Sequence, residues 1–172
     1  MIVITELIGD VVKRVSDSLD TNVNYQFGDW DYISHQLMEY SKSEEWEAKK
    51  YPVICLFSPF DEVKVNKRYH CEVKLDFLIA VNTISEYTNE ERSEYSFKEV
   101  LRPIYNSFIK ELKKDIRFDV YGEIPHIYSE NYRYGSRGVM QSDGKKFNDL
   151  IDGIDIKELE LKVNKEKCYE KL

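Results

Sequence analysis

The sequence has few cysteines, glycines and prolines, and no long apolar run. Its 172 residues include 3 Cys, 7 Gly and 4 Pro. So little glycine excludes a glycine-rich loop that cradles phosphate, and so little proline excludes a proline-rich linker protein. An odd number of cysteines without CxxC spacing is atypical of a disulfide framework or a zinc site. The longest apolar runs, such as residues 53–57, fall far short of the roughly 20 residues of a membrane-spanning helix.

The chain also lacks an excess of positive charge. It has 25 Lys and Arg against 32 Asp and Glu, a net charge of −7, and such a chain is a poor candidate for wrapping nucleic acid through its phosphates. The first residues, MIVITELIGDVVKR, have no basic start and no small-residue cleavage site. We therefore expect no signal peptide, and synthesis in a reducing cytoplasm.

What the chain does have is a globular composition, with 42% hydrophobic residues and an unusual 13 tyrosines. Apolar residues at three- and four-residue spacing predict amphipathic helices at about 2–19 and 91–114. Pro103 lies within the second helix, where it should cause a kink or mark a helix start. We expect these two helices to pack on one face of a sheet.

Alternating apolar residues predict the strands of that sheet. Residues 51–57 have the composition of a buried strand, and residues 69–81 alternate strictly until Leu78, where both faces become apolar. Short strands are expected within 116–120 and 127–134. In the last strand, at about 152–163, the apolar phase slips near Lys157 and Glu158, which predicts a β-bulge. The predicted fold is α+β, with a mainly antiparallel or mixed twisted sheet of about four to five strands.

Two regions depart from this simple order within a single predicted domain, 1–172. Residues 23–50 form an unusually long connection, which we interpret as an insertion. A charged C-terminal tail is expected at about 164–172. Within the insertion Asp29 or Asp31 lies near a helix start, and one apolar stripe is made of Phe27, Trp30, Ile33, Leu37 and Tyr40.

The most enzyme-like pattern is Asp61 followed by Glu72-Val73-Lys74. Nucleases of the PD-(D/E)xK type place an aspartate near a hairpin and an E-x-K on the next strand. Their carboxylates hold Mg²⁺ and their lysine helps to activate water. The same three residues also fit the solvated face of an alternating strand, and the acidic net charge opposes DNA binding.

Other catalytic patterns are missing. His35, His70 and His126 lie far apart in sequence without metal-ligand spacing, so we expect solvated histidines. Cys55 and Cys71 fall within apolar strand patterns and are expected to be buried. The sequence has no G-x-S-x-G elbow and no GxxxxGK[ST] loop. We therefore predict no enzyme activity, no cofactor and no bound metal.

One segment has the composition of a protein interface. Residues 127–138, IYSENYRYGSRG, mix aromatic side chains with arginines, the residue types that interfaces favour. We expect Tyr132, Arg133, Tyr134 and Arg137 to contact a partner protein. Trp46, inside the charged stretch SKSEEWEAKK, either packs back on the core or meets a partner, and it is the fifth candidate.

The order of these elements resembles the tail terminator and tail-completion proteins of long-tailed bacteriophages. The segments that carry this resemblance are a helix (TELIGDVVKRVSDSL), a YPVICLF strand and a strand ending in CEVKLDFLIAV, followed by SFKEVLRPIYNSFIKEL and IDIKELELKV. In that family an aromatic-Pro entry to the first strand and a helix near I-Y-P recur. Here Ile104-Tyr105 matches part of the latter, with the proline displaced to Pro103. The 23–50 region and the charged tail depart from the family pattern.

The resemblance implies a structural virion protein rather than an enzyme. Such proteins are small α+β subunits that close into a ring, often a hexamer, which caps the tail tube and offers the head connector a docking surface. The implied partners are further copies of the chain, the tail tube protein and the connector proteins, at the head–tail junction of the virion and away from membranes. A negative subunit would let DNA pass the ring lumen without adhering. The alternatives are the Mg²⁺-dependent nuclease and an α+β protein-binding module.

Overall fold

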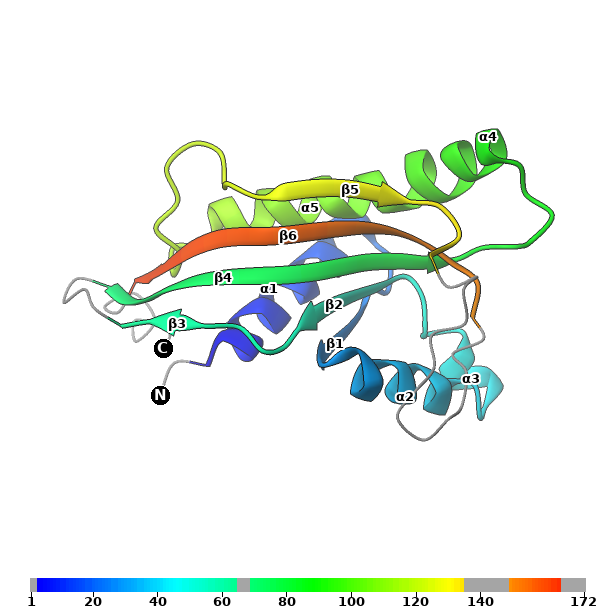
Figure 1. Cartoon of the computed structure of the whole chain (residues 1–172), viewed down its shortest axis with the longest axis horizontal. Helices are drawn as coiled ribbons and strands as arrows, with labels where there is room; N and C mark the ends of the chain where they lie inside the picture. The colour runs from blue at the N-terminus through cyan, green and yellow to red at the C-terminus, as the bar shows by residue number, and fades with distance from the viewer. Residues whose placement is uncertain (1–2, 65–68, 135–148, 165–172) are drawn as a thin grey trace.

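We describe a computed structural model of the chain, which covers residues 3–64, 69–134 and 149–164. The fold is α+β, with one open, mixed sheet whose strands run in the order β1-β2-β4-β6-β5 while β3 pairs with β4 (Figure 1). The strands are β1 (Asn24–Gly28), β2 (Val53–Phe57), β3 (Glu62–Val63), β4 (Tyr69–Asn82), β5 (Ile127–Asn131) and β6 (Ile151–Asn164). The helices are α1 (Ile4–Leu19), α2 (Trp30–Tyr40), α3 (Glu44–Glu47), α4 (Asn89–Arg92), the π-helical η1 (Ser93–Leu101) and α5 (Arg102–Lys114).

The long antiparallel pair β4–β6 forms the centre of the sheet. Its alternation is the predicted one, because every second residue of β4 faces the helices and is buried. α1 and α5 cover this face (Figure 1) and complete the main core. The buried residues that β4 contributes are Cys71, Val73, Leu75, Phe77 and Ile79. The prediction of two amphipathic helices on one face of an α+β sheet is therefore confirmed.

A second, smaller core lies on the opposite face at one end of the sheet. Here Leu78 and Ala80 of β4 are buried against Ile33 and Leu37 of α2. This explains why both faces of β4 become apolar near Leu78. Asp29 caps α2, since its carboxylate accepts a hydrogen bond from the Tyr32 N–H at 2.8 Å.

The β-bulge predicted from the phase slip is present in β6. The register of β6 against β4 shifts between Leu75 and Phe77, so that Lys157 and Glu158 lie opposite Asp76. Glu158 has a left-handed backbone (φ 53°), and its N–H donates to Asp76 Oδ1 at 2.7 Å. The Asp76 carboxylate therefore satisfies the Glu158 N–H, which the interrupted ladder leaves without a backbone partner.

The helical run from Asn89 to Lys114 changes register at its proline. π-turns extend to Leu101, and α-helical turns begin at Arg102, which places Pro103 in the first turn of α5. Proline has no N–H to donate to the carbonyl four residues earlier, and the first turn of a helix tolerates that loss. The predicted disturbance at Pro103 therefore takes the form of a change from π- to α-helical turns within one continuous helical run.

The interpretation of residues 23–50 as a pure insertion is wrong at its beginning. Asn24–Gly28 is a strand of the sheet, β1, and pairs in parallel with β2 over five residues. Phe27 consequently belongs to β1 and is 50% exposed, whereas the rest of the predicted stripe lies on α2. Within NYQFG the aromatic residues Tyr25 and Phe27 alternate with polar ones, but two apolar residues are too short a pattern to identify a strand.

The strand expected within 116–120 is reduced to a single bridge between Phe118 and Val163. The reason is the turn after α5, where the Asp115 carboxylate accepts a hydrogen bond from the Arg117 N–H. This bond competes with a regular ladder. The strand expected further on is β5, and it ends at Asn131.

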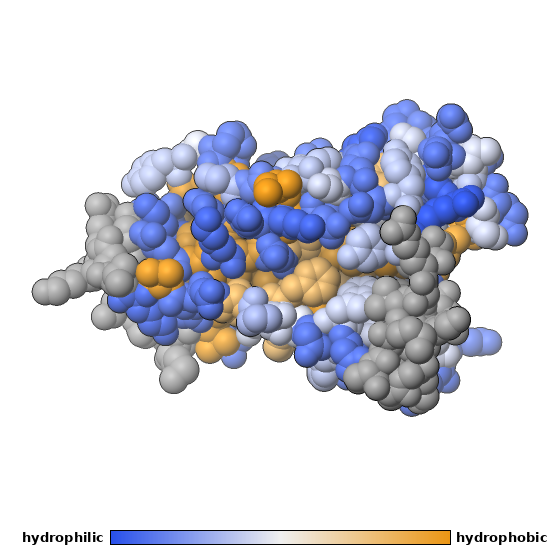
Figure 2. Space-filling model, viewed as in Figure 1, coloured by the Kyte–Doolittle hydropathy of each residue, from blue (hydrophilic) through white to orange (hydrophobic). Residues whose placement is uncertain are grey.

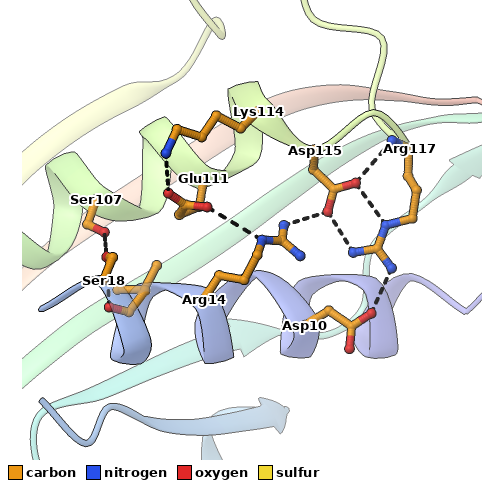
Figure 3. Close-up of polar contacts among 9 residues, drawn as sticks. Asp10, Arg14, Ser18, Ser107, Glu111, Lys114, Asp115 and Arg117 are labelled. Carbon is orange, nitrogen blue, oxygen red and sulfur yellow. Dashed lines mark hydrogen bonds and ion pairs between the residues drawn. The ribbon is translucent and has the colours of Figure 1, made fainter. Parts of the chain in front are cut away.

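Charged side chains join α1 to the end of α5 (Figure 3). Arg14 of α1 donates to Asp115 at 2.5 Å and lies 3.5 Å from a Glu111 oxygen. Arg117 donates to both Asp115 oxygens, at 2.8 and 2.6 Å, and to Asp10 of α1 at 2.7 Å. Burial by itself raises the pKa of Asp115, but hydrogen bonds from Arg117 and Arg14 outweigh it, and the pKa lies below its usual value.

No helix in the described part of the chain is long and apolar enough to cross a membrane.

Candidate functional surfaces

The turn after β5 brings three of the predicted interface residues together. Tyr132 is 38% exposed and its ring lies 4.6 Å from that of Phe97, centroid to centroid. Arg133 has a left-handed backbone (φ 55°) and an exposed side chain that donates to the Ser85 carbonyl at 3.2 Å. Tyr134 is half-buried against the core under α2, and burial raises its pKa. Tyr132 and Arg133 are thus presented to solvent, whereas Tyr134 anchors the turn.

A buried ion pair fixes this turn to the body of the fold. Arg92 and Asp152 are both 0% exposed, and the Arg92 guanidinium donates to Asp152 Oδ1 at 3.2 Å. Asp152 also accepts from the Ser96 hydroxyl at 2.7 Å and from the Arg133 N–H at 2.9 Å. Arg92 further donates to Thr83 Oγ1 at 2.9 Å. One carboxylate therefore joins the starts of β6 and η1 to the turn that carries Arg133.

The other two candidates do not join this cluster. Trp46 is 53% exposed on α3, where its ring meets Tyr40 edge-on at 5.4 Å. Tyr134 contacts Trp30, at the opposite end of α2, and ten residues of helix separate the two contacts by about 15 Å. Trp46 therefore lies on the surface rather than in the core, apart from the turn. Arg137 falls outside the described residues.

Sequence reasoning missed the two edges of the sheet, β1 and β5. Within the described chain no strand pairs with the outer side of either. Both edges carry exposed apolar side chains, namely Phe27 (50% exposed) on β1 and Ile127 (52%) and Tyr128 (38%) on β5. Neither strand contains Lys or Pro, two residue types with which natural edge strands prevent pairing. The single charged side chain on either strand is Glu130 of β5, and its carboxylate accepts hydrogen bonds from Arg102.

A cleft of about 880 Å³ lies along β4 and β6 and contains the three residues of the nuclease hypothesis. Asp61 comes from the segment before β3, and Glu72 and Lys74 come from the outward face of β4. Figure 2 shows this face of the molecule, where mostly hydrophilic side chains cover the two strands. The sequence-predicted residues therefore do converge. Five further carboxylates line the cleft: Asp76, Asp119, Glu123, Glu158 and Glu160.

The cleft lysines are bound to carboxylates. Lys74 donates to Glu160 at 2.8 Å, and this hydrogen bond raises the pKa of the lysine. Lys162 lies 3.8 Å from Glu72. A protonated Lys74 can stabilise negative charge on a phosphate, but it cannot accept a proton from water. With seven carboxylates and two lysines, the cleft favours a cationic ligand.

A mixed set of metal-ligand residues lies on the opposite face of β4. One carboxylate oxygen of Glu62, one ring nitrogen of His70 and the Cys71 sulfur all lie within 4.8 Å of one another. The Nε2 atom of His70 is buried and neither accepts nor donates a hydrogen bond. The expectation that His70 is a solvated side chain on the polar face is therefore wrong. The physical reason is a second register shift, between Tyr69 and Cys71, which breaks the alternation at His70.

The two cysteines are buried as predicted, whereas His126, which was expected to be solvated, is half-buried and hydrogen-bonded within the protein. Cys55 and Cys71 are both buried thiols, on opposite faces of the sheet, and burial raises the pKa of Cys55 to about 12. His126 is held by a Tyr105 hydroxyl at 2.7 Å and by the Ile124 carbonyl at 2.7 Å.

No family model, no curated protein and no solved structure matches this chain.

Proposed function

We propose that this protein is a structural virion component of the tail terminator type, which assembles into a ring at the end of a phage tail tube and meets the head connector there. The order of its elements supports the resemblance, since helix, YPVICLF strand, long alternating strand, helix and closing strand follow one another in the fold. The observation that carries the proposal is the pair of unprotected sheet edges, because a ring needs two different patches that fit each other.

The polarity of the strands suits such a contact. β1 is parallel to β2, whereas the remaining neighbours on the path to β5 are antiparallel. The two edge strands therefore run in opposite directions. If β1 of one copy lies beside β5 of the next, the strands pair antiparallel and the sheet continues across the subunit boundary. Each edge strand is five residues long, and pairing over that full length places Phe27 opposite Tyr128, on the face of the sheet that the helices cover.

The predicted interface residues fit next to this contact. Tyr132 and Arg133 directly follow β5, and both are exposed. Tyr and Arg contribute strongly to interfaces because they combine large contact area with hydrogen-bonding groups. The net charge of −7 repels phosphate, which suits a ring through which DNA passes without specific binding.

Light scattering coupled to size-exclusion chromatography tests the proposal. The wild type should form a closed oligomer of the 20.5 kDa chain, alone or on purified tail tubes. Phe27→Lys and Ile127→Lys should each release monomers, because a charge on an edge strand opposes pairing. Ile116→Lys is the matched control, since Ile116 is 60% exposed but lies outside the sheet. A wild type that stays monomeric and ignores tail tubes would refute the proposal, as would equal effects of all three substitutions.

The nuclease is the second candidate, because Asp61, Glu72 and Lys74 share one cleft. It requires DNA cleavage that depends on Mg²⁺ and disappears in Lys74→Ala. Lys98→Ala removes an exposed lysine on η1, outside the cleft, and should leave cleavage intact. Absence of cleavage in the wild type, or cleavage that Lys74→Ala leaves unchanged, rules this candidate out.

A further inference from the structure

We propose that Glu62, His70 and Cys71 form a site for a single Zn²⁺ ion that fastens β3 to β4. The three side chains offer one oxygen, one nitrogen and one sulfur, all within 4.8 Å of one another. Around a tetrahedral Zn²⁺ with bonds of about 2.0–2.3 Å, neighbouring ligand atoms lie roughly 3.3–3.8 Å apart. The limit of 4.8 Å is wider than this spacing by about 1.0–1.5 Å, so the three side chains must close around an ion.

The backbone explains why these three residues converge. Glu62 is the antiparallel partner of Val73, so its side chain lies on the same face of the sheet as Val73 and Cys71. Regular alternation would send His70 to the other face. The register shift between Tyr69 and Cys71 removes that constraint, and it places the imidazole beside the thiol that follows it in sequence.

The polar atoms of the cluster call for a partner. His70 Nε2 is buried without a hydrogen bond, and leaving such a group unsatisfied costs about 1–3 kcal/mol. Glu62 Oε2 is also buried without a hydrogen bond, although the Lys64 ammonium lies 3.2 Å from it. Lys64 is 59% exposed and can turn into solvent when a metal takes the oxygen.

The ligand types select the metal. A thiolate and an imidazole favour Zn²⁺ over Mg²⁺ or Ca²⁺, which prefer oxygen ligands alone. On binding, the Cys71 thiol releases its proton to solvent and the sulfur binds as thiolate. Three protein ligands leave a fourth position for water. The site is separate from the cleft, whose lining includes none of the three residues.

The ion would stabilise a weak part of the fold. Among the described residues β3 pairs with β4 at two positions, and so short a pairing is marginal by itself. The segment that leads into β3 supplies Pro59, Phe60 and Asp61 to one side of the cleft. Zn²⁺ would therefore fix the position of that side, and hydrogen exchange at Glu62 and Val63 should slow when the metal binds.

Titration of the chelator-treated full chain with Co²⁺ tests the site. One equivalent should give the visible absorption of tetrahedral Co²⁺ and a thiolate-to-metal charge-transfer band, and Zn²⁺ should displace both. His70→Gln and Glu62→Gln should each weaken Zn²⁺ binding by at least about 100-fold, because losing a mere supporting group already costs about 10–100-fold. Cys71→Ser should abolish the charge-transfer band.

The other two cysteines serve as controls. Cys55→Ser changes an equally buried thiol on the opposite face, and Cys168→Ser changes the third thiol of the chain. Both variants should keep the charge-transfer band. Circular dichroism identifies any variant that fails to fold, and the half-buried His70 keeps the test available if Cys71→Ser is such a variant. No band in the wild type, a band that survives Cys71→Ser, or an unchanged Zn²⁺ affinity of His70→Gln overturns the proposal.

Discussion

The buried pair of Arg92 and Asp152 gives the sharpest prediction for stability. Arg92→Met keeps the length of the side chain and removes the charge. Among the described residues, the Asp152 carboxylate, 0% exposed, then retains its hydrogen bonds from Ser96 and from the Arg133 N–H. Removing one partner of a buried ion pair costs about 3–5 kcal/mol, because the remaining charge stays desolvated without compensation.

This loss is large compared with the stability of a typical domain, about 5–15 kcal/mol. Urea unfolding followed by circular dichroism and tryptophan fluorescence measures it, and the midpoint of thermal unfolding should fall by roughly 6–20 °C. Asp152→Asn should cost a similar amount, since it strands the guanidinium. The double variant should cost clearly less than the two single losses together, because both charges are then gone.

The matched control is the exposed pair of Lys98 and Glu94, 2.7 Å apart with side chains 65% and 48% exposed. Lys98→Met should cost less than about 0.5 kcal/mol, as expected for a surface i,i+4 pair. The reasoning is refuted if Arg92→Met costs no more than Lys98→Met. It is also refuted if the two buried substitutions add up within about 0.5 kcal/mol, since independent sites would do so.

Further predictions concern acid, burial and packing. The lowered pKa of Asp115 contributes stability above its unfolded pKa of about 3.9, so the cost of Asp115→Asn should shrink as pH falls below about 4 in urea titrations. Burial raises the pKa of Asp155, so Asp155→Asn should raise the unfolding free energy at neutral pH, with no gain below about pH 4. Cys55, whose pKa is raised to about 12, should resist alkylation in the folded protein and react in urea, as mass spectrometry can show. Gly153→Ala should destabilise by about 1–3 kcal/mol, because its Cβ would lie 2.7 Å from Leu78 Cδ1; an unchanged urea midpoint would contradict this.

Sequence patterns predicted the parts of the fold that bury continuous apolar faces. The alternation of β4, the stripes of α1 and α5, and even the bulge at Lys157 and Glu158 were visible because each changes the period of buried residues. β1 was overlooked because its alternation comprises only Tyr25 and Phe27, too few apolar residues to distinguish a short edge strand from a loop. His70 was misplaced because a register shift moves a side chain between faces without any mark in the sequence.

Of the candidate surfaces, too, only part could be predicted from the sequence. Residue type alone made Tyr132 and Arg133 candidates for a protein interface, and the structure places both on the surface beside a sheet edge. The same reasoning could not find the edges themselves, since exposure of β1 and β5 depends on which strands pair elsewhere. Nor could it bring Glu62 to His70 and Cys71, because that contact depends on the register of β3 against β4.

The central strand pair also sets the order of events during synthesis. Asp76 and Glu158, which meet at the bulge, are 82 positions apart, so β4 leaves the ribosome long before its partner exists. Until β6 follows, one side of β4 offers a long row of unpaired backbone groups to other chains. Charged residues that flank or interrupt such a strand oppose pairing with other chains, and Glu72, Lys74 and Asp76 alternate along β4. We therefore expect neutral substitutions of these three residues to increase aggregation during refolding.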